Sequence, residues 1–292
     1  MKRKNVRKRI IYGGRMIPNA GIRARYGRDI AGMIRKLSAE TAKRIMGIYP
    51  AKSPVQDSAA EEENSLLEML GREIENAVSA QIQALVDRML HTQDRYTDSS
   101  VNAAVRPLGE AFSLGSRPAM TAERTRNIMA ACRMENVALI KGLADSWYSK
   151  VREAVARAVM NGYTRRALQD ELAEIEGISV RRAYRIAKDQ THKAYNALAY
   201  QKMRDCGVTH WQWLHGGGTK TERRTHVRDV RFGGLNHAIF RVGEKAYDPE
   251  AWPIAQRDGG GFEGAEIEPG ELPFCSCIRR PVLELGDEED SA

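Results

Sequence analysis

The 292-residue sequence has few cysteines and no long apolar run. Cys132, Cys206, Cys275 and Cys277 are too few and too unevenly spaced for a disulfide framework, which is typical of proteins in a reducing compartment. No apolar stretch approaches the roughly 20 residues that a membrane span needs. The basic N-terminus is not followed by the apolar segment of a secretory signal. These absences predict a soluble intracellular protein.

Two further classes are excluded by missing patterns. No internal repeat is visible and no heptad pattern persists over three or four heptads, which excludes solenoids and long coiled coils. Gly216, Gly217 and Gly218 do not form a phosphate-binding loop, because Lys220 lies at the wrong spacing and no apolar helix headed by Ser or Thr follows it. We therefore expect no nucleotide site in this loop.

Positive charge is concentrated at the N-terminus, within a formal net charge of +8. Because bound Lys and Arg release counterions from phosphates, this block predicts contact with nucleic acid, although aromatic residues for base stacking are sparse there. The alternative is a solvated arm that docks on an acidic protein surface. The candidate nucleic-acid-binding residues are Lys2, Arg3, Lys4, Arg7, Lys8 and Arg9.

Apolar residues recur at three- and four-residue steps through most of the chain, which predicts helices. The expected helices cover residues 22–48, 66–90, 101–112, 136–160, 165–176 and 179–206, with a further helix capped by Thr121. Residues 49–64 are read as a linker and residues 94–100 as a break. Gly162, Gly177 and Gly207 are the expected helix ends, and Thr164 and Ser179 the expected N-caps.

The last third of the sequence has a different pattern. Trp211 and Trp213 alternate with polar residues and predict a short half-buried strand, and residues 244–261 lack periodicity. The predicted fold class is therefore α+β, with a predominantly helical N-terminal two thirds and a compact mixed C-terminal domain of short strands and long loops.

Four separate segments of this region occur in a specific order. They read IAKDQTHKAYNALAYQKMRDCGVTHWQW, GGGTKTERRTH, YDPEAWP and PGELPFCSC, and their motif residues are Asn196, Trp211 or Trp213, Arg223, His226, Cys275 and Cys277. Together they resemble the phage head morphogenesis family, typified by the Mu F minor head protein. Two positions depart from the family pattern: Ala-Lys-Asp-Gln at 187–190 stands where Ala-Arg-Thr-Glu is frequent, and His237 follows Asn236 where Gly is frequent.

The resemblance implies an organisation and a role. Together with the charge pattern, it divides the chain into a basic disordered arm (1–20), a helical docking region (21–135), a head morphogenesis domain (136–285) and an acidic tail (286–292). It implies a minor capsid protein of a tailed phage or prophage, located in the virion at the head interior or portal vertex, and in the host cytoplasm during assembly. The implied partners are the portal protein, a major capsid or scaffold protein and phage double-stranded DNA, with no membrane. Assistance in procapsid assembly and genome ejection is the expected function.

Three interpretations of the motif residues remain open. The first is structural: Cys275 and Cys277 alternate on a short closing strand while His226 orients a loop, so that no catalytic residue and no cofactor is expected. The second is a zinc site formed by His226, Cys275 and Cys277, because thiolate and imidazole suit tetrahedral zinc, although a one-residue gap between the cysteines is tight. The third is a nucleic-acid-cleaving enzyme or toxin that uses Arg223 and His226, with an acid such as Asp229 nearby.

Overall fold

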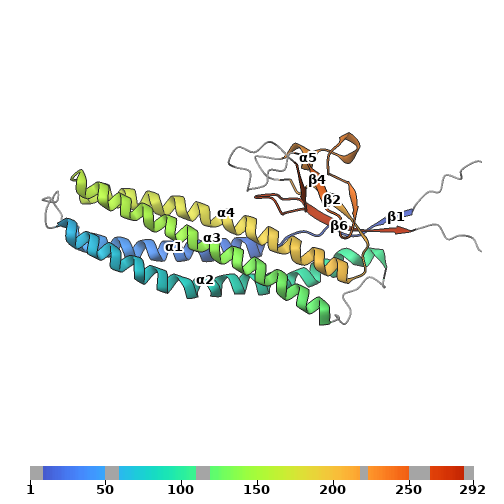
Figure 1. Cartoon of the computed structure of the whole chain (residues 1–292), viewed down its shortest axis with the longest axis horizontal. Helices are drawn as coiled ribbons and strands as arrows, with labels where there is room; N and C mark the ends of the chain where they lie inside the picture. The colour runs from blue at the N-terminus through green and yellow to red at the C-terminus, as the bar shows by residue number, and fades with distance from the viewer. Residues whose placement is uncertain (1–8, 50–58, 110–118, 218–222, 250–263, 286–292) are drawn as a thin grey trace, which may run out of the picture. The chain divides into compact units, whose positions relative to one another are not determined.

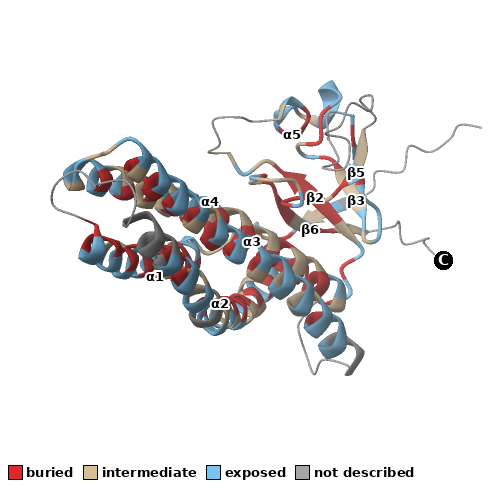
Figure 2. Cartoon of the chain, turned by 60° about the vertical axis from the view of Figure 1, so that its left-hand side comes forward, coloured by how far each residue is buried: buried red, intermediate tan, exposed pale blue. Residues whose placement is uncertain are grey.

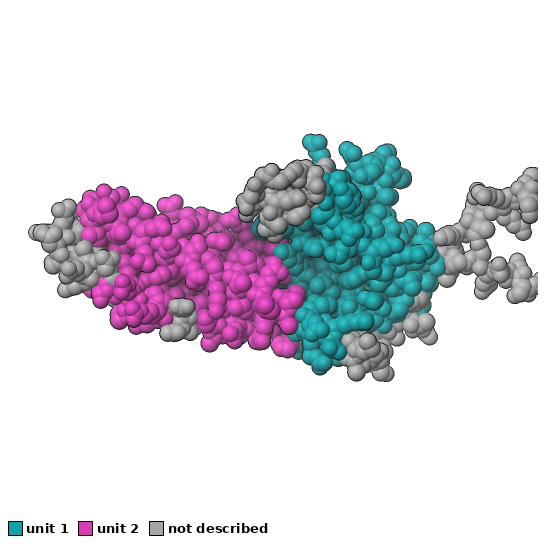
Figure 3. All heavy atoms as spheres, in the orientation of Figure 1, with its two compact units in different colours: residues 1–19, 92–129, 191–292 teal, residues 20–91, 130–190 magenta. Residues whose placement is uncertain are grey.

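The computed structural model describes residues 9–49, 59–109, 119–217, 223–249 and 264–285. Four long helices and six short strands make up most of this part of the chain, which confirms the α+β prediction. The chain divides into two compact units, shown in separate colours in Figure 3: unit 1 comprises residues 1–19, 92–129 and 191–292, and unit 2 comprises residues 20–91 and 130–190. The divisions fall within helices α2 (Ala59–Val105), α3 (Ala119–Met160) and α4 (Arg165–Asp205).

Unit 2 is a four-helix bundle of α1 (Ala20–Ile48) and the adjoining parts of α2, α3 and α4 (Figure 1). Buried residues line the facing sides of these helices (Figure 2). A buried polar network crosses this core. Asn136 accepts a hydrogen bond from the Tyr26 hydroxyl at 2.9 Å and donates to Gln190 Oε1 at 3.0 Å. Burial raises the pKa of Tyr26, so this hydroxyl stays protonated.

The helices are longer than the sequence pattern predicts. Helix α4 continues through Gly177 and Ser179, so Ser179 is not an N-cap and Gly177 does not end the helix. A glycine inside a helix costs about 1 kcal/mol, but Leu172, Ile175 and the 5%-exposed Ser179 lie on one continuous buried stripe that offsets this cost.

A continuous buried face also explains the length of α2. It passes through residues 94–100 because Gln93, Thr97 and Val101 continue its buried face, and the Thr97 hydroxyl donates to the Gln93 carbonyl at 2.7 Å. Residues 59–64, expected within a linker, are also helical. Up to residue 109, where the described range ends, α2 is followed by a 3-10 turn, η1 (Arg106–Leu108), in place of the separate helix expected over residues 101–112.

Three of the predicted helix ends are confirmed, at Gly162, Thr164 and Gly207, whereas Thr121 lies inside α3 and is not its N-cap. Gly162 and Gly207 follow α3 and α4 with φ of 61° and 80°, the left-handed conformation that glycine adopts without strain. The Thr164 side chain accepts a hydrogen bond from the Ala167 amide at 3.2 Å, as an N-cap does.

Unit 1 is built on a four-stranded sheet of order β1-β6-β2-β3, in which all three pairings are antiparallel. Its strands are β1 (Arg9–Tyr12), β2 (His210–Leu214), β3 (Ile239–Arg241) and β6 (Ile278–Leu285), and β4 (Ala246–Asp248) and β5 (Ala265–Ile267) form a separate pair. The disordered arm predicted over residues 1–20 is therefore wrong for residues 9–12, which pair with β6, and the aperiodic stretch 244–261 contains β4. The predicted domain limits otherwise stay predictions.

The core of unit 1 lies between the sheet and the helical segments of α2 and α4 that belong to this unit. Trp211 and Trp213 are both fully buried, and they belong to one apolar cluster with Val101, Met203 and other residues. Gln212, on the opposite face of β2, is also buried and donates to the His237 carbonyl at 3.1 Å. β2 is a central strand that is covered on both faces. The predicted strand therefore lies at the expected position, but it is more buried than the predicted half-buried strand.

Unit 1 contains one buried lysine side chain among its described residues, that of Lys202. The fully buried Lys202 ammonium lies 2.8 Å from Asp98 Oδ1 and donates to the Asp94 carbonyl at 2.6 Å. These contacts satisfy the buried ammonium group and join α4 to α2.

None of the helices in the described ranges is long and apolar enough to cross a membrane. Several expectations fall outside the described residues: the basic side chains of Lys2, Arg3, Lys4, Arg7, Lys8 and Arg9, residues 50–58 of the linker, residues 250–261 of the aperiodic stretch and the acidic tail at 286–292.

Candidate functional site

The Arg-x-x-His motif forms a single helical turn, α5 (Arg224–Val227). Arg223 stands just before the turn, and its carbonyl accepts hydrogen bonds from the amides of His226 and Val227 at 3.1 and 3.2 Å. Residues three apart lie on the same side of a helical turn, so Arg223 and His226 reach the same neighbouring segment. The Arg223 guanidinium donates to the Pro273 carbonyl at 3.3 Å, two residues before Cys275.

The Cys-Ser-Cys segment precedes β6 as an irregular turn and does not lie on the strand. Phe274 has φ of 59°, and the Cys275 amide donates to the Leu272 carbonyl at 3.0 Å. The expectation that the two cysteines alternate on a closing strand is therefore wrong. This tight turn brings the two thiols together, which an extended strand would not do.

The turn that carries the two cysteines requires a glycine at position 216. A Cβ atom on Gly216 would lie 1.9 Å from the Ser276 carbonyl oxygen, and the Ser276 hydroxyl donates to the Gly217 carbonyl at 2.9 Å. Gly216 therefore permits a close approach of two backbones. This role explains a glycine at this position without a bound phosphate.

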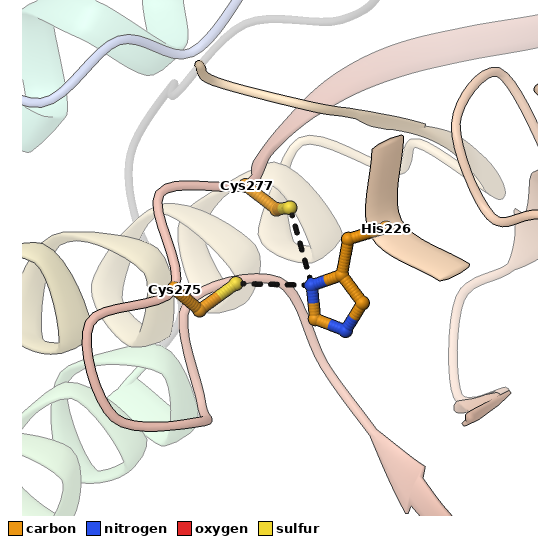
Figure 4. Close-up of side chains that lie close together, drawn as sticks. All are labelled: His226, Cys275 and Cys277. Atoms are coloured by element: carbon orange, nitrogen blue, oxygen red, sulfur yellow. Dashed lines mark hydrogen bonds between the residues drawn. The ribbon is translucent and has the colours of Figure 1, made fainter. Parts of the chain in front are cut away.

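His226, Cys275 and Cys277 meet in one buried cluster, and one ligand atom from each lies within 4.8 Å of the others. Both sulfur atoms lie 3.5 Å from the same nitrogen, His226 Nδ1 (Figure 4). His215, at the end of β2, brings its Nδ1 to 3.7 Å from Cys277 Sγ, and its backbone amide donates to the Asn236 side chain at 2.9 Å. The motif residues separated by 49 positions in the sequence thus converge on one point.

A carboxylate contacts the second ring nitrogen of His226, Nε2. Asp248, on β4, is fully buried, and its Oδ2 lies 3.0 Å from His226 Nε2. Because a carboxylate accepts, Nε2 carries the proton and Nδ1 presents its lone pair to the sulfur atoms. Trp213 packs its ring edge-on against the His226 ring at 5.1 Å between centroids.

The pKa values of the two thiols shift in opposite directions. The hydrogen bond with Cys277 is the largest cause that lowers the pKa of Cys275, and burial opposes this shift. The same hydrogen bond, followed by burial, raises the pKa of Cys277.

The remaining motif residues lie beside this cluster. Asn196, on α4, is buried next to Gly270, where an added Cβ would lie 2.5 Å from its Nδ2. The Asn196 carbonyl accepts a hydrogen bond from Arg279 at 3.2 Å. Trp211 stacks on Phe240 at 4.8 Å and lies under the Arg279 guanidinium. These residues pack the turn that carries the cysteines against α4 and the sheet.

The geometry offers little for acid–base cleavage of a nucleic acid. His226 is 2% exposed, with one ring nitrogen against the thiols and the other against Asp248. Asp229 does not face His226. It caps the 3-10 turn η2 (Val230–Phe232) and contacts Arg231 and His237, and the Arg231 hydrogen bond, followed by that of His237, lowers its pKa. A general base must reach the proton it removes, and a buried His226 does not.

Sequence reasoning missed three side chains of this site. Asp248 belongs to the YDPEAWP segment, which was noted only as part of a family pattern. His192 Nε2 lies 3.0 Å from the Cys277 carbonyl, in a helix read only for its apolar stripe. Arg279 lies two residues after Cys277 and is 1% exposed. The buried charge of Arg279 leaves no periodic signal in a sequence.

Comparison with known proteins supports the resemblance. Residues 149–279 match the family described as "Phage Mu protein F like protein". An uncharacterized protein of Haemophilus influenzae (strain ATCC 51907 / DSM 11121 / KW20 / Rd) is 28% identical over 158 residues, which cover 52% of this chain. This aligned region covers only 29% of the length of that relative. No solved structure matches the chain. Residues 149–279, which contain α4, the sheet strand β2 and the His–Cys cluster, are therefore similar to the phage Mu protein F-like family.

Proposed function

We propose that this chain is a head morphogenesis protein of a tailed phage or prophage, with a structural and not a catalytic role. The family match over residues 149–279 carries the proposal. The buried His–Cys cluster supports it, because the motif side chains contact one another and hold segments together. The protein would be a minor capsid component that associates with the portal vertex and packaged DNA, assists procapsid assembly and takes part in genome ejection.

Assembly into heads is the test of this role. In a phage that carries the gene, mass spectrometry of purified heads should detect the chain, and the purified chain should bind the portal protein of the same genome. Deletion of the gene should leave fewer infectious particles, and the full-length chain supplied from a plasmid should restore them. Normal infectious heads that lack the chain would contradict the proposal.

The motif provides a sharper variant for the same assay. His226→Ala removes the ring at the centre of the cluster and should prevent incorporation into heads, because the turn that carries the cysteines loses its anchor. Arg241→Ala, an exposed residue on β3 of the same unit, should be incorporated normally. Equal incorporation of both variants would remove the cluster from the proposed role.

The proposed DNA contact rests on the basic N-terminus, and the pairing of β1 refines its test. Arg9 starts β1, so the variant should spare residues 9–12 and change Lys2, Arg3, Lys4, Arg7 and Lys8 to Gln. Each lost phosphate contact should reduce the slope of log affinity against log salt by about 0.9, so the whole change should reduce it by up to about 4.5. The measurement is double-stranded DNA binding across a salt series. An unchanged slope would exclude these residues from DNA contact.

A further inference from the structure

We propose that His226, Cys275 and Cys277 bind a structural Zn²⁺ ion, with His215 as the fourth ligand. The ion would be held by Nδ1 of both imidazoles and by two thiolates, and the thiol protons would be released to solvent on binding. The proposal does not depend on the role in head assembly, since it concerns the internal chemistry of unit 1.

The distances fit a shared ion. Zinc lies about 2.3 Å from a thiolate and about 2.0–2.1 Å from an imidazole nitrogen, so two such ligands at a tetrahedral angle are about 3.6 Å apart. Cys275 Sγ and Cys277 Sγ are each 3.5 Å from His226 Nδ1, and Cys277 Sγ is 3.7 Å from His215 Nδ1. The tight turn through Phe274 places both sulfur atoms of the Cys-x-Cys pair at this distance from His226 Nδ1.

Hydrogen bonding alone accounts poorly for this arrangement. A neutral imidazole nitrogen has one lone pair, which accepts one S–H well, yet two sulfur atoms approach Nδ1 at the same distance. A cation placed between the three atoms explains why both sulfur atoms are equally close. Figure 4 shows both cysteines directed at the same ring nitrogen.

The surroundings of His226 match those of a metal ligand. Its Nε2 faces the buried Asp248 carboxylate at 3.0 Å, and such carboxylate–histidine pairs orient and strengthen the imidazole ligands of zinc. Burial also separates this site from a catalytic triad of thiol, imidazole and carboxylate. Cys277 is 1% exposed and His226 is 2% exposed, so a substrate would not reach the sulfur. Closed sites of four protein ligands are structural.

The ion would join three segments of unit 1. His215 directly follows β2, His226 lies in α5, and Cys275 and Cys277 precede β6. Because α5 is a single helical turn, it has little stability of its own. A metal ion that ties α5 to the two adjacent central strands would supply the missing stability.

Metal analysis of the purified full-length chain tests the proposal. Protein expressed with zinc in the medium should contain about one zinc ion per chain. Cobalt substitution should give thiolate-to-cobalt charge-transfer absorption and the intense d–d bands of a tetrahedral site. Cys275→Ser, Cys277→Ser and His226→Ala should each lose stoichiometric metal. Cys206→Ser, which changes another buried cysteine of unit 1, should retain it.

Two further variants keep the test independent of folding failure. Asp248→Asn should bind zinc about 10–100-fold more weakly in competition with a chromophoric chelator, while retaining the ligands. His215→Ala should also weaken binding and leave a three-ligand site.

A folded wild-type chain that binds no zinc on titration would overturn the proposal. So would a Cys275–Cys277 disulfide in freshly purified protein, or full zinc content in Cys277→Ser. Unchanged affinity in His215→Ala would remove His215 from the ligand set.

Discussion

Removal of zinc from the purified protein is expected to lower its melting temperature by roughly 8–16 °C. A ligand present at a thousand times its dissociation constant stabilises the folded state by about 4.1 kcal/mol, and each kcal/mol shifts the midpoint of a domain of this size by roughly 2–4 °C. Tryptophan fluorescence is a suitable probe, because Trp213 packs on the His226 ring. The helical signal in circular dichroism should change less, since the long helices do not include the proposed ligands.

The control for this experiment is the double variant Cys275→Ser, Cys277→Ser. It should melt at the temperature of the chelated wild-type chain, and a chelator should not shift it further. A wild-type chain that contains zinc and melts at the same temperature with and without chelator would show that the ion, although bound, does not stabilise the fold.

Arg279→Ala is expected to lower the free energy of unfolding by roughly 3–5 kcal/mol, the range for breaking a buried ion pair on one side. Arg279 is 1% exposed and donates to Glu268 at 2.7 Å and to the Asn196 carbonyl at 3.2 Å. Its guanidinium lies 4.5 Å from the Tyr200 ring and 5.0 Å from the Trp211 ring. The substitution removes all of these contacts and leaves a cavity beside the sheet. Urea unfolding followed by fluorescence measures the change.

Two control variants identify which property of Arg279 matters. Arg279→Lys keeps the charge but loses the planar group that stacks between the aromatic rings, so an intermediate loss is expected. Arg241→Ala, on the exposed surface of β3, should stay within about 0.5 kcal/mol of the wild-type chain. An Arg279→Ala variant as stable as Arg241→Ala would show that the buried guanidinium contributes nothing net to folding.

Local features of this chain were predictable from its sequence. Gly162 and Gly207 end helices because a left-handed residue is required there, and Thr164 caps the next helix through its own side chain. Each of these events depends on a few neighbouring residues, so sequence patterns capture them. The order of the Mu F-like motifs was equally readable, because it is a property of the chain and not of its packing.

Helix lengths were predicted less well, for a physical reason. Polar residues at 93 and 97 and the Gly177–Ser179 segment resemble breaks when read by local propensity. In the structure they lie on long buried stripes, and burial outweighs a propensity cost of about 1 kcal/mol. The pairing of β1 with β6 joins residues near opposite ends of the sequence, and no local signal specifies it.

By itself, the sequence determined the fold class and the helix ends at Gly162, Thr164 and Gly207, because each depends on composition or on short-range spacing. The motif residues His226, Cys275 and Cys277 were identified from the order of segments that resembles the Mu F-like family. Only the tertiary structure decided how these residues meet. It placed two sulfur atoms on one imidazole nitrogen, set Asp248 behind the ring and brought His215 alongside. Such convergence depends on strand order and on tight turns between distant segments, and chain spacing alone carries no information about either.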